Sequence, residues 1–350
     1  MPSHFLLRVA GTLALALVAA LLCVWLRTPL PWMIGPLLAT AAATLLRRRT
    51  ESWAPLRNLG QATIGLALGL YFTPQVGALV LGLWWAVALG IVWAFVLGGL
   101  FSLWLQRCNA RHLPGLGPAT TWFAGAVGGA SEMTLLAERA GGRTDLVAAA
   151  HSLRLLIVAV VIPFAMQFSG VQGLDAAGSV ARPVSATGLL LLGLAAAGGA
   201  WVLDRLGRAN PWFLGPMVVA VLLTLGDQQL SAIPDWLSAL AQLFIGISLG
   251  VRFTPAFLHT APRWLAAVAL GTLAMIVLCT GFAWALAGAT GLHPATLVLG
   301  TTPGGITEMS ITAKVLQLGA PVVTVFQLCR LFAVLVLVEP LYHWQQARRR

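Results

Sequence analysis

Apolar runs separated by short polar or basic segments dominate this chain. A helix needs about 20 apolar residues to cross a bilayer, and the longer runs reach that length. We therefore predict membrane helices in the runs at residues 1–26, 78–105, 144–168, 188–203, 264–288 and 321–343. The first run also has the composition of a signal peptide. A comparable run at 188–203 precedes the same downstream motifs, so we expect the first run to be retained.

Short motifs at polar and glycine positions occur twice, in the same order, once in each half of the chain. Three of them are Pro-Trp-x-x-Gly-Pro, Gln-x-x-Ile-Gly-x-x-Leu-Gly-x-x-Phe-Thr-Pro and Pro-Ala-Thr. They begin at Pro31 and Pro211, at Gln61 and Gln242, and at Pro118 and Pro294. This order indicates an internal duplication, with a first membrane repeat over residues 8–168 and a second over residues 186–343.

A further motif, Gly-Gly-x-[Ser/Thr]-Glu-Met, occupies residues 128–133 and recurs 176 positions later at 304–309. A glycine pair lets the backbone leave helical geometry, and the Ser or Thr that follows can cap a new helix start. A broken helix is therefore predicted in each half. Within a bilayer such backbone is tolerated only where protein buries it or where it lines a watery cavity.

The alternative is that each glutamate of this motif simply occupies the first turn of a helix, where the helix dipole favours it. We predict ligand or ion binding at the motif in both halves. The candidate residues are Gly128, Gly129, Ser131, Glu132, Gly304, Gly305, Thr307 and Glu308.

An arginine follows each glutamate after 22 residues: Arg154 follows Glu132, and Arg330 follows Glu308. A lone charge near the bilayer centre costs about 2.5–3.5 kcal/mol, so a partner or water is expected. Our hypothesis is that the acids and bases form two ion pairs, within or across the halves, beside a cavity at the midplane. The alternative, a salt bridge that only fixes a hairpin, is compatible with it.

His151 lies one helical turn before Arg154, where the second half has Gln327. An imidazole can exchange a proton near neutral pH and an amide cannot. His151 is therefore a candidate for proton coupling, and a packing residue with a hydrogen bond is the alternative.

The composition is that of an integral membrane protein, with 59% hydrophobic and 9% charged residues, against about 25% charged in soluble proteins. The net charge of +11 is spread in short clusters, which suits loops at an anionic membrane face. No polar stretch is long enough to form a DNA-binding domain, so nucleic acid is not an expected partner. The scattered cysteines and histidines lack metal-ligand spacing. No metal, cofactor or enzymatic activity is predicted.

If each half crosses an odd number of times, most basic residues fall on one side of the membrane, and only Arg27, Arg182 and Lys314 face the other. We therefore predict an all-α polytopic membrane protein of two inverted repeats. Each repeat has about five transmembrane helices plus a broken or re-entrant helix. The expected location is the bacterial inner membrane, with both termini cytoplasmic.

The duplicated Pro-Trp-x-x-Gly-Pro, the Phe-Thr-Pro helix and the twinned Gly-Gly-x-[Ser/Thr]-Glu-Met together resemble the bacterial membrane AbrB family, over about residues 10–343. Members of that family are labelled ammonia monooxygenase or AbrB-type regulator. The family is distantly similar to cation/proton antiporters and bile-acid-type symporters. That likeness implies broken helices that cross the membrane, whereas the charge pattern favours a hairpin.

The function predicted on these grounds is a secondary transporter of a small solute or ion, coupled to protons or cations. A membrane sensor that alters gene expression is the alternative, and an ammonia monooxygenase-like oxidase is the third. Helix N-termini suit anions and free carbonyls suit cations, so the ligand stays open. The expected partners are the lipid bilayer and the solute or ion, and a homodimer stays open.

Overall fold

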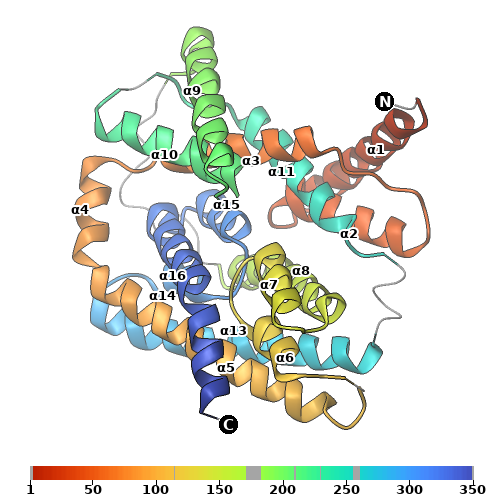
Figure 1. Ribbon diagram of the computed structural model, residues 1–350. Coiled ribbons are helices and arrows are strands. Elements are labelled where there is room, and N and C mark those ends of the chain that lie inside the picture. Colours follow the sequence, from red (N-terminus) through yellow and green to blue (C-terminus); the bar gives the residue numbers. More distant parts are fainter. Residues whose placement is uncertain are drawn as a thin grey trace. The chain divides into compact units, whose positions relative to one another are not determined.

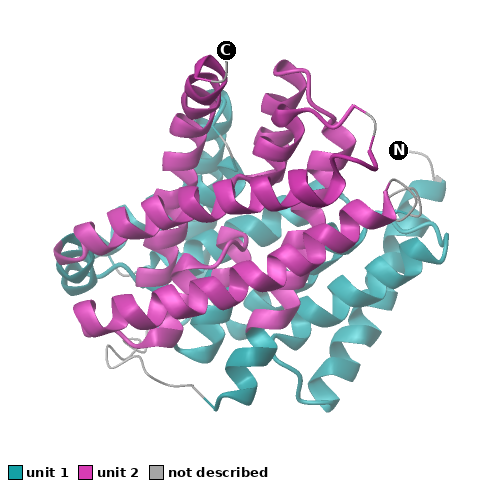
Figure 2. Cartoon of the chain, turned by 90° about the horizontal axis from the view of Figure 1, so that it is seen from below, with its two compact units in different colours: residues 1–81, 163–255, 310–321 teal, residues 82–162, 256–309, 322–350 magenta. Residues whose placement is uncertain are grey.

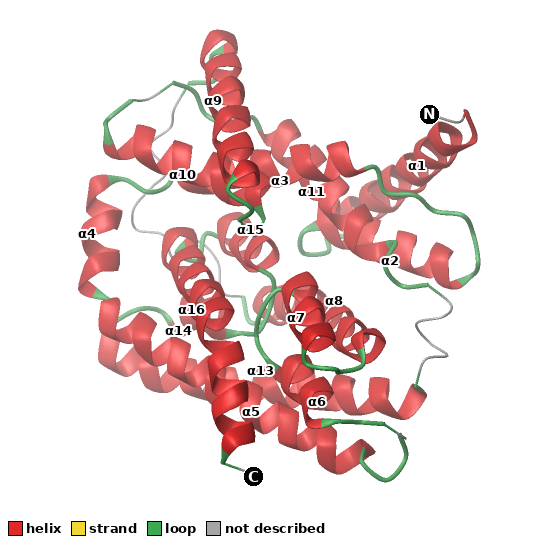
Figure 3. Ribbon diagram, in the orientation of Figure 1, coloured by secondary structure: helices red, strands yellow, loops and turns green. Residues whose placement is uncertain are grey.

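The computed structural model describes residues 3–113, 115–170, 183–208, 210–228, 230–254 and 261–348. All regular structure in these ranges is helical, and no strand occurs within them (Figure 3). The expected all-α class is confirmed, and it follows from apolar runs that are too long for strands.

Apart from one helix of the first half that has no described counterpart, the helices follow one another in the same order in the two halves of the chain (Figure 1). The first half holds α1 (Ser3–Trp25), α2 (Pro31–Leu45), α3 (Ala54–Gly69), α4 (Pro74–Gly82), α5 (Trp84–Asn109), α6 (Pro118–Gly125), α7 (Ala130–Arg139) and α8 (Thr144–Phe168). The second half holds α9 (Ala186–Arg205), α10 (Pro211–Leu225), α11 (Asp235–Gly250), α13 (Pro262–Thr290), α14 (Pro294–Thr301), α15 (Ile306–Leu316) and α16 (Ala320–Ala347).

Within the described residues, six helices are long and apolar enough to cross a membrane, three from each half: α1, α5, α8, α9, α13 and α16. The pair α3 and α4 would make a seventh span, bent by 85° at its break. The protein is thus a multi-pass membrane protein. Helices α2, α10 and α11 are apolar but have only 15 or 16 residues, which is short of the usual crossing length. Five crossings per half and the inverted arrangement therefore stay predictions.

Two compact units divide the chain differently from the sequence halves (Figure 2). Unit 1 comprises residues 1–81, 163–255 and 310–321, and unit 2 comprises residues 82–162, 256–309 and 322–350. Each unit draws on both halves, and the division falls inside α8, α15 and α16. The repeats predicted at 8–168 and 186–343 are therefore a division of the sequence, whereas the compact units combine pieces of both.

Glycines set the helix crossings of unit 1. Helix α3 packs on α10, and α11 packs on α2. A Cβ at Gly65 would overlap the carbonyl oxygen of Phe213, and one at Gly246 would overlap that of Met33. Equivalent glycines of the two halves thus make equivalent backbone contacts, which is the close approach that small residues permit between membrane helices.

In unit 2, α5 packs on α6 and on α13, and α13 packs on α14. Trp264, which is fully buried, donates from Nε1 to the carbonyl oxygen of Leu146 at 3.1 Å. Trp122 on α6 donates from Nε1 to the carbonyl oxygen of Val338 on α16 at 3.2 Å. These bonds tie elements that are distant in sequence around the candidate site, which lies wholly in unit 2.

Candidate site at two broken helices

The first break separates α6 from α7. Helix α6 ends at Gly125, and the next residue, Ala126, is extended with φ −55° and ψ 138°. Gly129 is also extended, with φ −69° and ψ 139°, and α7 begins at Ala130. The break expected at the glycine pair is present, and it begins two residues before that pair. The carbonyl end of one short helix and the amide end of the next therefore meet at 126–129.

The second break has the same form. Helix α14 ends at Thr301, Thr302 is extended with φ −62° and ψ 141°, and α15 begins at Ile306. Both breaks span four residues, and the second also contains Pro303, which cannot donate a backbone hydrogen bond. The interrupted geometry thus recurs at the offset of 176 residues seen in the sequence.

Arg154 on α8 holds the carbonyl end of α6. The last four carbonyls of a helix lack partners within it. The guanidinium donates from Nη2 to the carbonyl oxygen of Ala126 at 2.9 Å, and more weakly from Nη1 to those of Ala124 and Gly125 at 3.4 and 3.5 Å. Arg154 is only 3% exposed. Its positive charge therefore lies against the partly negative end of the half-helix.

His151 completes this cap. Its Nδ1 lies 2.9 Å from Nη2 of Arg154, and its Nε2 lies 2.9 Å from the carbonyl oxygen of Phe123. A guanidinium can only donate, so Nδ1 accepts and the ring proton resides on Nε2, which donates to Phe123. The contacts thus hold a neutral imidazole in one tautomer, because a second proton on Nδ1 would face the Arg154 guanidinium directly.

Arg330 and Gln327 on α16 cap the second break in the same way. Arg330 donates from Nη1 to the carbonyl oxygen of Thr302 at 2.8 Å and from Nη2 to that of Gly304 at 2.9 Å. Gln327 accepts from Arg330 through Oε1 at 2.5 Å. It donates through Nε2 to the carbonyl oxygen of Leu299 at 2.7 Å. We call the two sets, His151 with Arg154 and Gln327 with Arg330, the carbonyl clamps.

His151 and Gln327 make equivalent hydrogen bonds in the two carbonyl clamps. Each of these residues accepts a hydrogen bond from its arginine and donates one to an equivalent carbonyl, that of Phe123 or Leu299. A neutral imidazole and an amide both offer one acceptor and one donor. The difference between the halves is therefore compatible with a shared positioning role and does not by itself require proton exchange at His151.

The ion pair expected between Glu132 and Arg154 is absent: these two described residues form no ion pair, and the guanidinium faces backbone carbonyls instead. In the second half, the Nη1 and Nη2 groups of Arg330 likewise donate to carbonyls and to Gln327. The physical reason is that each break leaves backbone carbonyls without partners inside their helix. A buried carbonyl without a hydrogen-bond donor costs free energy, and the arginines supply the donors.

Each glutamate instead folds back over the glycine before its own helix. A Cβ added at Gly129 would overlap Oε2 of Glu132, and one at Gly305 would overlap Oε2 of Glu308. Both carboxylates lie in the first turn of a helix, α7 or α15, where the dipole stabilises negative charge. Only glycine leaves room for this arrangement. Glu132 is partly exposed, whereas Glu308 is 6% exposed.

Ser131 and Thr307 are not the helix caps that we expected. The residue that caps α7 is Gly129, which offers no side chain, and Ser131 lies exposed within the first turn. Thr307 is likewise inside the first turn of α15, where it is buried. Each helix begins two residues earlier than a cap at Ser131 or Thr307 would place it. At α7 the reason is that Gly129 already adopts the extended conformation of a cap position.

Each break also packs against the long helix of the other half. A Cβ at Gly128 would lie 3.0 Å from Cγ1 of Val334 on α16, and one at Gly304 would lie 2.9 Å from Cγ1 of Val158 on α8. The two breaks and the carbonyl clamps therefore form one site. Val158 and Val334 were not predicted from the sequence as site residues. The signal was their spacing, because each lies four residues after Arg154 or Arg330 and so on the same helix face.

A small cavity adjoins the first break. Its volume is about 20 Å³, and Trp122, Ala126, Val127 and Val334 are among its lining residues. Such a space holds about one water molecule, and its apolar walls offer few polar partners. Among the residues that the structure describes, no three His, Cys, Asp or Glu side chains are grouped as a metal site would require.

These features define an all-helical, multi-pass membrane protein with two matched broken helices. The chain belongs to the AbrB family: the family described as "Transition state regulatory protein AbrB" matches residues 32–346. "Uncharacterized protein YhjN" of Bacillus subtilis (strain 168) is 24% identical over 335 residues, which cover 89% of this chain and 86% of the relative. "Putative regulator AbrB" of Escherichia coli (strain K12) is 30% identical over 213 residues, covering 60% of this chain and 61% of that protein.

Proposed function

We propose that this chain is a secondary transporter of a small solute or ion in the bacterial inner membrane, with both termini in the cytoplasm. The observation that carries the proposal is the matched pair of broken helices, brought together in one unit with an arginine at each carbonyl end. Discontinuous helices in the two halves of a membrane protein are typical of transporter binding sites.

The free-energy cost of two buried arginines supports a functional reason for the breaks. An uninterrupted helix would satisfy its own backbone and would need no buried arginine. Here Arg154 and Arg330 are 3% and 5% exposed, although a charge within the membrane costs about 2.5–3.5 kcal/mol on insertion scales. The arginines are explained by the broken backbone that they stabilise, and a broken backbone is useful where it contacts a solute.

The roles that we assign follow from these contacts. The carbonyl clamps hold the half-helices in place, and the glycine pairs permit the turn between them. We assign the exchange of a proton or cation to Glu132. Its carboxylate is partly exposed and makes no hydrogen bond or ion pair among the described residues. The negative charge of this carboxylate suits a proton or a cation better than an anion.

Transport requires movement of this site. The cavity of about 20 Å³ beside the first break is far below the 300–1,000 Å³ typical of small-molecule sites. We infer that the described conformation is closed around the breaks and that a rearrangement opens them to one side of the membrane at a time.

We further propose that the protein is not an enzyme and works without a cofactor. Its partners in this proposal are the bilayer lipids and the transported solute or ion, without nucleic acid. A homodimer is compatible with the proposal and not required by it, because all the site residues come from one chain.

A regulatory role is the second candidate, and the printed names of the family and of the relative from Escherichia coli favour it. A membrane sensor would bind its ligand at the same breaks and change gene expression without moving the solute. Only the transporter would carry the solute across the membrane, so a flux measurement separates the two candidates.

The test is a flux assay with the purified protein in liposomes that contain a pH-sensitive dye, with cations and small organic acids as solutes. We compare the wild type with Glu132→Gln, which removes the proton-exchanging group but keeps its size. Glu138→Gln is the matched control, because Glu138 is an exposed carboxylate on the same helix. We expect flux in the wild type and in the control, and its loss in Glu132→Gln.

Two results would contradict the proposal. Equal flux in Glu132→Gln and wild type would remove Glu132 from the mechanism. Saturable binding of a solute to folded wild type, without flux of that solute in liposomes, would favour the sensor.

A further inference from the structure

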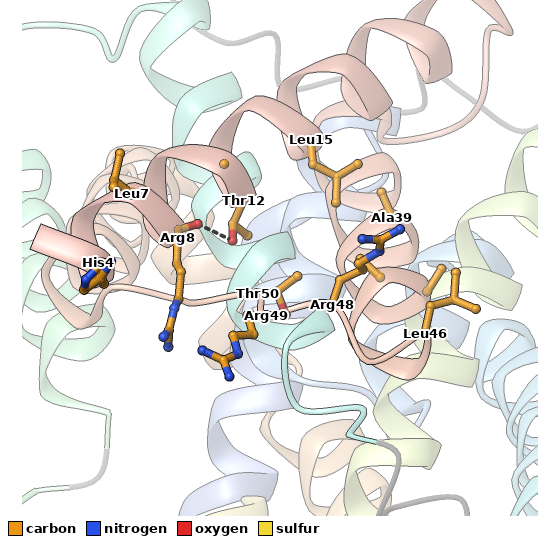
Figure 4. A pocket seen from close by; sticks show the side chains of 13 residues that line it. His4, Leu7, Arg8, Thr12, Leu15, Ala39, Leu46, Arg48, Arg49 and Thr50 are labelled. Atoms are coloured by element: carbon orange, nitrogen blue, oxygen red, sulfur yellow. Dashed lines mark hydrogen bonds between the residues drawn. The ribbon is translucent and has the colours of Figure 1, made fainter.

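A groove between α1 and α2 of unit 1 has a volume of about 820 Å³ (Figure 4). Most of its lining is apolar and comes from the two helices, as with Leu7, Leu15 and Leu46. One end is basic, with Arg8, Arg48 and Arg49. None of these residues belongs to the site at the breaks.

Small residues open this groove, and the second half of the chain lacks them. Helices α9 and α10 correspond to α1 and α2 at an offset of 180 residues. The packing has the same register, since Gly35 abuts Ala19 and Gly215 abuts Gly199. The groove residues Gly11, Ala39, Ala42 and Ala43 correspond to Leu191, Val219, Leu222 and Leu223. At these four positions the first half therefore has small side chains where the second half has bulky ones, whereas the wall residues Leu7 and Leu15 correspond to the smaller Thr187 and Ala195.

The basic end is also specific to the first half. At the same offset, Gln228 and Gln229 stand in the sequence where the groove has Arg48 and Arg49. The excess of arginine on one membrane side follows from the orientation of the chain, but that rule predicts no groove. The coincidence of a groove with a basic end is what calls for a ligand.

The loop that carries these arginines is tied to α1. The backbone N–H of Glu51 donates to Oγ1 of Thr12 at 3.0 Å, and Thr12 Oγ1 donates to the carbonyl oxygen of Arg8 at 2.8 Å. Arg8 also pairs with Glu51 at 3.4 Å, so its charge is partly offset. Arg48 and Arg49 form no ion pair in the described part of the chain. They are therefore the main positive charges available to a ligand.

We propose that this groove binds one anionic phospholipid, with its phosphate at Arg48 and Arg49 and an acyl chain along the apolar wall. Arginine pairs with phosphate through charge-assisted hydrogen bonds, and basic pockets beside membrane helices bind anionic lipid headgroups. A bilayer lipid can reach the wall, because Leu7 and Leu15 on α1 are 68% and 38% exposed. A soluble anion would make no use of an apolar groove of this size.

The test is native mass spectrometry of the detergent-purified protein, titrated with phosphatidylglycerol, phosphatidylcholine or inorganic phosphate. Wild type should retain phosphatidylglycerol in preference to phosphatidylcholine. Arg48→Gln/Arg49→Gln should raise its apparent Kd about tenfold, because two phosphate contacts are lost. Ala42→Leu/Ala43→Leu should abolish binding, because it fills the groove with the side chains of the second half. Leucine fits there without disturbing the core, since Ala42 is exposed and Ala43 half-buried.

The matched control is Arg107→Gln/Arg111→Gln, which removes two exposed arginines outside the groove and should leave the apparent Kd unchanged. The proposal is overturned if this control weakens binding as much as Arg48→Gln/Arg49→Gln does. Equal binding of phosphatidylcholine would also overturn it, as would competition by inorganic phosphate alone, which would indicate a simple anion site. None of these outcomes depends on whether the protein transports a solute.

Discussion

The two breaks share one backbone arrangement but differ in the side chains around it. Each is held by an arginine and one neighbour, His151 in the first and Gln327 in the second. The second break is flanked by the buried hydroxyls of Thr301 and Thr302, where the first has Gly125 and Ala126.

The carboxylates differ as well, since Glu132 is partly exposed and Glu308 is buried. The shared part of the site is thus the support of the broken backbone, and the part that differs is the polar surface offered to a ligand. We infer from this contrast that the clamps are structural and that specificity lies in the hydroxyls and carboxylates.

The strongest test of the shared support is Arg154→Ala. This change removes the donor from buried carbonyls of the first break, and each buried polar group left unpaired costs about 1–3 kcal/mol. We expect a much lower midpoint of thermal unfolding for the purified protein, and the same for Arg330→Ala. Arg143→Ala is the control, because its pair with Asp145 is exposed and such pairs contribute about 0–1 kcal/mol. If Arg154→Ala melts like the wild type, the clamp does not support the break.

A smaller effect is expected from Gly129→Ala and Gly305→Ala. The added Cβ would overlap Oε2 of the following glutamate and force the carboxylate away from the start of its helix, where it loses about 0.3–1 kcal/mol of dipole stabilisation. We expect reduced flux with a modest loss of thermal stability. A Cβ at Gly281 on α13 meets no atom within 4 Å, so Gly281→Ala serves as the control. Full flux in both glycine variants would show that the carboxylate position is unimportant.

The smallest effect is expected from His151→Gln, which converts the first clamp into the second. The amide keeps one acceptor for Arg154 and one donor for Phe123, so stability should change by less than about 1 kcal/mol and flux should persist. His151→Leu is the matched comparison. It leaves the carbonyl of Phe123 without its donor and should destabilise the protein by about 1–3 kcal/mol. Loss of flux in stable His151→Gln would restore His151 as a proton carrier.

Local features of the sequence were enough to predict the helical class, the membrane runs and the positions of both breaks. Apolar run length sets where a helix can cross a bilayer, and a glycine pair marks where a helix can stop. The cap position was predicted two residues late, because Gly129 adopts the extended conformation that we had assigned to Ser131.

The partner of each arginine was decided only by the tertiary structure. The 22-residue spacing between Glu132 and Arg154 is equally compatible with an ion pair and with the observed carbonyl cap. The choice depends on how α8 lies against the end of α6, and sequence distance does not encode that orientation. The same holds for Val158 and Val334, which join each long helix to the break of the other half.

The sequence by itself thus determined a duplicated, all-helical membrane protein with a broken helix in each half, because hydrophobicity and glycine act within single segments. The tertiary structure decided that the two halves share two compact units and that histidine and glutamine serve equivalent roles. These outcomes depend on hydrogen bonds between helices, whose geometry exists only once the chain has folded.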